Sequence, residues 1–216
     1  MTGTPSDAAP TGLWDHGLAD FVDATASDSP TPGGGSAAMV AAATGCALVL
    51  MALKVTARRK DAPDGLDTLI LAGERRLESL RDYAEADIRV FESYMAALRL
   101  PKDTEAAIEE RRSALAAATE GATEVPLSAA QEALETLDLA RRAADLAHVS
   151  IVSDVGAGAA LVHGALTAVL YSVDVNLRGL KDETKREEYG VSRAHLQTEG
   201  DDRHEAIRRM VAERLA

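Results

Sequence analysis

The pattern of apolar and polar positions predicts helices from one end of the chain to the other. Residues 14–26 carry apolar side chains at helical spacing, which predicts a short amphipathic helix. After Pro30 and Pro32, an apolar run of small residues predicts a helix over 35–57. A longer helix over 66–98 follows a turn at 63–65 and ends before Pro101.

The second half of the chain continues in the same way. We expect helical segments over 104–120, 126–148, 155–180 and 182–216. Thr104 is a typical capping residue, Pro126 suits a first helical turn, and Gly190 and Gly200 are expected to interrupt the last segment. The predicted fold class is all-α, a single-domain antiparallel helical bundle over 13–216 that follows a disordered lead-in over 1–12.

Composition narrows the class of protein. Hydrophobic residues make up 46% of the 216 residues but aromatic residues only 3%, so the core must consist mainly of Ala, Leu, Val and Ile. The net charge of -12 argues against a nucleic-acid partner, because phosphate binding needs a basic surface. The single Cys46 cannot form an intramolecular disulfide, and we expect a buried free thiol in a cytoplasmic protein.

Two runs of small residues raise the questions of whether the chain spans a membrane and whether it forms a dimer. Residues 36–53 have no charge over 18 positions, about the minimum for a bilayer span, but the run is mostly Ala and Gly and leads directly into Lys54. We expect the central helix of a bundle there and no membrane partner. Because small-residue faces bury little area within one chain, we expect a homodimer.

Three consecutive glycines, Gly33, Gly34 and Gly35, come directly before the first small-residue helix. A helix N-terminus has about four backbone N–H groups without an intrahelical acceptor, and glycines let a ligand oxygen approach them closely. The alternative is an ordinary tight turn with Ser36 as the cap. Composition alone does not choose between the two.

Asp87 is the first candidate for proton transfer. Five apolar or aromatic residues lie within roughly 40° of it on the helix surface: Leu80, Tyr83, Phe91, Tyr94 and Leu98. A carboxylate on such a stripe is costly unless it is paired or used. The alternative is a structural carboxylate paired with an arginine such as Arg76 on the same face.

Asp154 and Asn176 form a second candidate pair. Asp154 is also explained as a helix cap, and in one straight helix the two residues would be about 33 Å apart. Either they serve different places, or a kink or a second subunit brings them together. The cluster at Arg58 and Lys60 is a candidate site for an anionic tail. His148 and His163 have no metal-ligand spacing, so no metal is expected.

Four stretches together resemble the cyclodeaminase/cyclohydrolase family, over roughly residues 18–182. They are SDSPTPGGGSAA, LPKDTEAAIEERRSAL, VPLSAAQEA and VSDVGAGAALVHGALTAVLYSVDVNLRGLKD. The family fold is an all-helical bundle that assembles as dimers. The resemblance implies a folate site lined by Thr31, Gly33, Gly34, Gly35 and Ser36, and it matches Asp87 and Asp154, the candidate catalytic residues, to family motifs. Asn176, Arg58 and Lys60 are kept as further candidates for substrate binding.

The resemblance also implies the reaction. We expect a methenyltetrahydrofolate cyclohydrolase, because no formiminotransferase domain fits in the chain, with no cofactor beyond the tetrahydrofolate substrate. The alternatives are a formiminotetrahydrofolate cyclodeaminase that releases ammonia and a non-catalytic folate-binding dimer. The last is kept because the chain departs from the family pattern at 59–61, 148–152 and 172–176.

Overall fold

The structure is a computed structural model that describes residues 12–216, so nearly all of the expected lead-in lies outside the described residues. Over this range the regular elements are all helices, which confirms the all-α prediction. The elements are η1 (Leu13–Asp15), α1 (Leu18–Thr25), α2 (Gly34–Ala57), α3 (Leu66–Arg99), α4 (Glu105–Leu146), η2 (Val149–Ile151), α5 (Val152–Leu177) and α6 (Glu183–Leu215).

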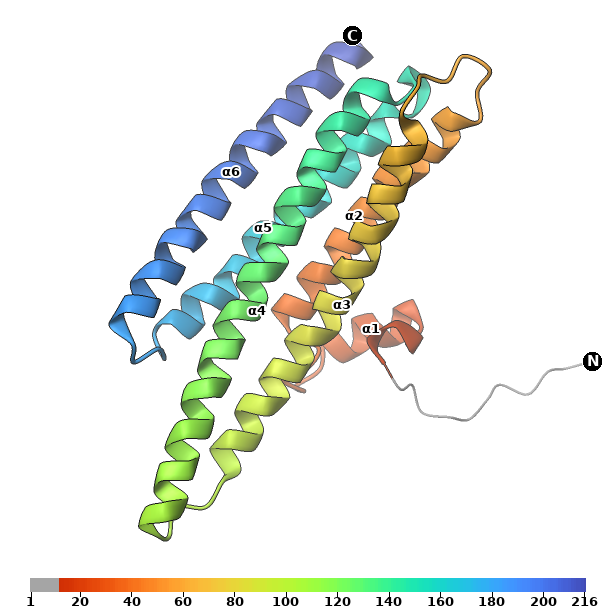
Figure 1. Ribbon diagram of the computed structural model, residues 1–216. Coiled ribbons are helices and arrows are strands. Elements are labelled where there is room, and N and C mark those ends of the chain that lie inside the picture. Colours follow the sequence, from red (N-terminus) through yellow and green to blue (C-terminus); the bar gives the residue numbers. More distant parts are fainter. Residues whose placement is uncertain (1–11) are drawn as a thin grey trace, which may run out of the picture.

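Four long helices, α2 to α5, form an antiparallel bundle. In Figure 1, α3 and α4 lie side by side at the front, with α2 and α5 behind them. Helix α6 packs against α4 and α5, and the short α1 lies near the beginning of α2. One core of Ala, Leu and Val side chains is continuous through these helices, as the composition predicts.

Glycines allow α2 and α5 to approach each other closely. A Cβ on Gly45 would lie 2.5 Å from the Gly158 carbonyl oxygen, and a Cβ on Gly158 would lie 2.5 Å from the Gly45 carbonyl oxygen. Either distance is far below van der Waals contact, so only glycine fits at both positions. This crossing fixes the register of the two small-residue helices.

Three predicted interruptions are wrong. Helix α4 runs without a break through Pro126, and α6 runs through Gly190 and Gly200. In α6, buried Leu196, Ile207 and Val211 are part of the core, and this tertiary packing outweighs the low helix propensity of glycine. In α4, Thr104 is the N-cap as predicted, and its side chain accepts a hydrogen bond of 3.1 Å from the Ala107 amide.

Helix α2 and the stretch Val149–Leu177 are each long and apolar enough to cross a membrane, judged by length and composition. In the structure they pack against each other within the bundle, and most of the apolar stretch of α2 is buried. Cys46, in the middle of α2, is fully buried and free, as predicted.

Candidate functional site

A cavity of about 710 Å³ opens at one end of the bundle. Its walls come from the beginning of α2, the middle of α3, the segment of α4 around Thr119 and Ala122, and the last third of α5. Most of the lining is apolar or aromatic, including Phe91, Tyr94 and Tyr171. Among the described residues that line it, Asp87 is the only Asp, Glu, Lys or Arg. The cavity therefore has one charge, and that charge is negative.

Asp87 caps helix α2 from a different helix. Its Oδ2 accepts hydrogen bonds from the Ser36 backbone amide at 2.8 Å and from the Ser36 hydroxyl at 2.7 Å. Gly33 is the N-cap residue of α2 and has no capping side chain, so the expected Ser36 cap is replaced by the carboxylate. The positive end of the α2 dipole faces this negative charge, a favourable arrangement.

Gly35 makes this approach possible. A Cβ at position 35 would overlap Oδ1 of Asp87, so any larger residue would push the carboxylate away. The three predicted glycines and Thr31 all line the cavity beside Asp87. Ser36 is fully buried and does not line it. Its role in the structure is to hold Asp87, a neighbour 51 positions away in the sequence.

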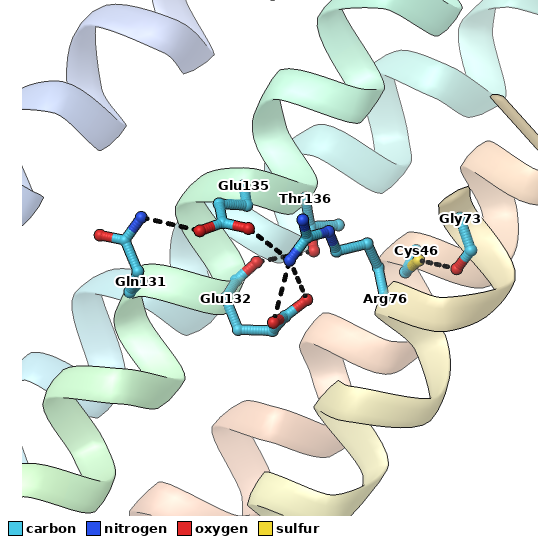
Figure 2. A network of polar contacts seen from close by, with 7 residues as sticks. All are labelled: Cys46, Gly73, Arg76, Gln131, Glu132, Glu135 and Thr136. Carbon is cyan, nitrogen blue, oxygen red and sulfur yellow. Dashed lines mark hydrogen bonds and ion pairs between the residues drawn. The ribbon is translucent and has the colours of Figure 1, made fainter.

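The alternative role for Asp87, as the partner of Arg76, is wrong. Figure 2 shows Arg76 pointing toward α4, where its Nη1 donates to both carboxylate oxygens of Glu132 at 3.0 and 3.1 Å and pairs with Glu135. Glu132 is 12% exposed, so this ion pair neutralises a carboxylate close to the core. Asp87 is thus left to the cavity and to Ser36.

Asn176 also lines the cavity, and a proline accounts for its position. Pro126 has no backbone N–H, so the carbonyl of Ala122, four residues earlier in α4, loses its helical donor. The Asn176 side-chain amide donates to that carbonyl oxygen instead. The interaction fixes the Asn176 side chain at the cavity wall and leaves its own oxygen as a free acceptor site.

The remaining predicted residues lie away from the cavity. Asp154 is in the first turn of α5, at the opposite end of that helix from Asn176, and it is not the cap because Ile151 is the N-cap residue. Arg58 and Lys60 follow the last residue of α2, whereas the cavity borders its first residues. Within one chain, the structure therefore brings together Asp87, Asn176, Thr31 and the glycines, but not Asp154, Arg58 or Lys60.

Sequence reasoning did not single out Tyr171, Ser172 or Val175, which form the α5 wall together with Asn176. Their spacing was a usable signal, because residues 168, 171, 172, 175, 176 and 179 share one helical face. The departure from the family pattern at 172–176 falls on this wall. The departure at 148–152 is far from it, at η2 and the start of α5.

Comparison with known proteins gives matches over most of the chain. The family model described as formiminotransferase-cyclodeaminase matches residues 17–194. A methenyltetrahydrofolate cyclohydrolase from Methylorubrum extorquens is 32% identical over 171 residues, which cover 78% of this chain and 82% of that protein. The formimidoyltransferase-cyclodeaminase of Gallus gallus is 30% identical over 80% of this chain, which spans only 32% of that longer protein.

A solved structure shares the fold. The formiminotetrahydrofolate cyclodeaminase from Thermotoga maritima superposes with a TM-score of 0.82 at 24% identity, covering 92% of this chain and 96% of that one. The family match over residues 17–194 confirms the resemblance expected from the motifs. The chain therefore belongs to the formiminotransferase-cyclodeaminase family.

Proposed function

We propose that this protein is a methenyltetrahydrofolate cyclohydrolase, which hydrolyses 5,10-methenyltetrahydrofolate to 10-formyltetrahydrofolate without a cofactor beyond the folate. The observation that carries the proposal is a single carboxylate, Asp87, in a cavity whose other lining residues, within 12–216, are uncharged. The one-carbon bridge of the substrate is a cation. A fixed negative charge in an apolar cavity favours binding of that cation.

In the proposed mechanism Asp87 moves the protons. A water oxygen bonds to the bridging carbon while Oδ1 of Asp87 takes a proton from that water. The bond from this carbon to N5 then breaks, N5 takes a proton, and the hydroxyl loses its proton to leave the formyl group on N10. Two protons leave the water and one is taken up, so each turnover releases one proton.

The chain's other residues position these groups. Ser36 holds Oδ2, so that Oδ1 is the oxygen available to the substrate. Gly34 and Gly35 are the first residues of α2, and their amides have no acceptor within the helix. They are suited to bind the oxygen that becomes the formyl group. The aromatic rings of Phe91, Tyr94 and Tyr171 offer surfaces for the pterin and benzoyl rings.

Hydrolysis is measured directly as loss of the methenyl chromophore. We expect the purified protein to accelerate it, and we expect Asp87→Asn to lower kcat by about 10²–10⁴-fold. Asp64→Asn, in the exposed turn before α3, is the matched control and is expected to keep full turnover. A wild-type rate equal to the buffer blank would refute the proposal, and ammonia release from formiminotetrahydrofolate would assign the deaminase reaction instead.

We further propose that the protein is a cytoplasmic homodimer and that the outer face of α2 and α5 is its interface. This face, called the α2–α5 face below, is apolar along its middle, and the exposed Lys54 and Arg178 lie at its two ends. Its exposed positions are Thr44, Ala47, Met51 and Val55 on α2 and Ala157, Ala160, Leu161, Gly164, Tyr171 and Val175 on α5. A contiguous apolar surface of this kind favours association. The buried free thiol of Cys46 fits a reducing compartment.

A further inference from the structure

The cavity has no cation for the acidic end of a folate. The glutamate tail of tetrahydrofolate carries two carboxylates, whereas the cavity lining of the described residues contains no Lys or Arg. Arg58 and Lys60, the cations expected from the sequence, follow the far end of α2. With 24 residues in α2, that end is about 36 Å from Gly34. A binding site for the tail must therefore use a different residue.

The register of α2 and α5 shows in which direction the cavity extends. The two antiparallel helices cross where Gly45 meets Gly158. Gly35 is ten residues before this crossing and Ala168 is ten residues after it, so both lie at the level of Asp87. From there the cavity follows α5 to Gly179. Arg178 comes ten residues after Ala168, about 15 Å further along the helix axis.

Arg178 leaves α5 beside the face that lines the cavity. Its backbone is still helical, with φ -66° and ψ -26°. It comes seven residues after Tyr171, which lines the cavity, so the two side chains leave the helix within about 20° of one direction. The distance of about 15 Å along the helix axis from Ala168 to Arg178 must be spanned by the substrate and the arginine together. It is comparable with the length of a para-substituted benzoyl group carrying an amino acid, added to the reach of an arginine side chain.

The guanidinium of Arg178 is also available. Its side chain is exposed and has no ion pair or hydrogen bond within the part of the chain that the structure describes. The next two arginines are paired: Arg186 donates to the Leu180 carbonyl at 3.1 Å, and Arg193 forms a two-pronged pair with Asp174 at 2.8 and 2.9 Å. An arginine at a helix C-terminus is favoured by the dipole, and its planar donor group matches a carboxylate.

We propose that Arg178 forms a carboxylate-binding subsite at the rim of the cavity and holds the glutamate tail of the folate. This inference rests on the proposed function and assigns its substrate contact. The charges then match from end to end: the Asp87 carboxylate meets the cationic one-carbon bridge, the apolar wall meets the aromatic linker, and the Arg178 guanidinium meets the tail.

The test combines a residue change with a substrate change. Arg178→Gln is expected to raise KM for methenyltetrahydrofolate about 10- to 100-fold, the effect of losing a charge-assisted contact, with kcat nearly unchanged. The dimethyl ester of the glutamate tail should raise KM of the wild-type protein by a similar factor. The variant and the wild type should then have equal KM values for the ester, because the lost contact is the same one.

Arg141→Ala, an exposed arginine on α4 far from the cavity, is the matched control and should leave KM unchanged. An unchanged KM in Arg178→Gln, or a rise caused by Arg58→Gln in its place, overturns the subsite while the cyclohydrolase assignment stands. Calorimetric binding of tetrahydrofolate and its ester separates the two claims. If the wild type has no turnover but its binding of tetrahydrofolate depends on Arg178, the subsite is supported and the cyclohydrolase function is not. If the wild type does not bind tetrahydrofolate, both the subsite and the function are overturned.

Discussion

The contact between Gly35 and Asp87 joins the backbone of one helix to the carboxylate of another, with no room for a methyl group. We expect Gly35→Ala to displace the carboxylate, break its bonds to Ser36 and lower turnover by 10²-fold or more, an effect as large as losing an acid–base group. Gly190→Ala is the control. Its Cβ would meet open space, so it should keep full activity and raise stability by about 0.5–1 kcal/mol. Full activity in Gly35→Ala would show that Asp87 need not occupy its observed position.

Cys46 gives a second prediction for a single residue. Burial, with a smaller effect from the charge of Glu132, raises the pKa of its thiol from 9.0 to about 12. The native protein should therefore not react with a thiol reagent at pH 8. The protein unfolded in guanidinium should react with one equivalent of the reagent per chain.

The same pKa gives a pH dependence with a definite sign. Between pH 9 and 12 the unfolded chain loses a proton that the folded chain keeps, so this thiol lowers the free energy of unfolding by about 1.4 kcal/mol per pH unit. Below pH 9 its contribution is constant. Urea unfolding of the wild type and of Cys46→Ala should show this difference in slope, and parallel curves above pH 9 would contradict it.

At the level of the helix, Pro126 lowers the stability of α4 but fixes the position of the Asn176 side chain. Pro126→Ala restores an N–H donor to the Ala122 carbonyl, which then no longer needs Asn176. Alanine is about 3 kcal/mol better than proline in a helix, and the lost ring removes two methylene groups at about 0.8 kcal/mol each, so stability should rise by roughly 1 kcal/mol. Turnover should fall, because Asn176 loses its anchor. A variant that is more stable and fully active would remove Asn176 from the site.

The same proline shows the limit of prediction from the sequence. A proline after a polar stretch favours a helix start by local rules, and these rules contain no term for a carbonyl satisfied by a residue 54 positions away. The glycines of α6 were misjudged for the same reason. Local patterns did locate the turn at 33–35 and the stripe around Asp87, because those signals are periodic or compositional. That Asp87 bonds to Ser36 depends on the packing of two helices.

Asp154, Arg58 and Lys60 show a different limit. These residues are predicted together with the glycines, from motifs and charge clusters along the chain. The order of motifs in a sequence does not show which end of a helix faces a cavity. In the structure they belong to the end of the bundle where α2 finishes and α5 begins. Within the same chain, the length of α5 separates Asp154 from the cavity, and the length of α2 separates Arg58 and Lys60 from it.

At the scale of the whole molecule, charge determines which surface can meet a second copy. Two chains of net charge -12 repel each other, so the surfaces that meet should carry little negative charge, and the exposed positions of the α2–α5 face include no Asp or Glu. The face is about 36 Å long over α2 and two helices wide, roughly 700 Å² at about 10 Å per helix. That area is close to the roughly 800 Å² per partner of a standard stable interface. Tyr171 and Val175 belong to both the face and the cavity wall, so the interface would border the site.

Light scattering after size exclusion tests the interface. The wild type should have twice the chain mass of 22.7 kDa. Leu161→Arg places a charge in the middle of the α2–α5 face. Because association would then bury an unpaired charge, this variant should be a monomer. Its circular dichroism should show that it remains folded. Leu71→Arg puts the same charge on α3, at a site 50% exposed against 39% for Leu161, and should leave the dimer intact. If both variants keep the doubled mass, the chains associate through another surface. If the wild type is a monomer at micromolar concentration, the apolar face has a different partner.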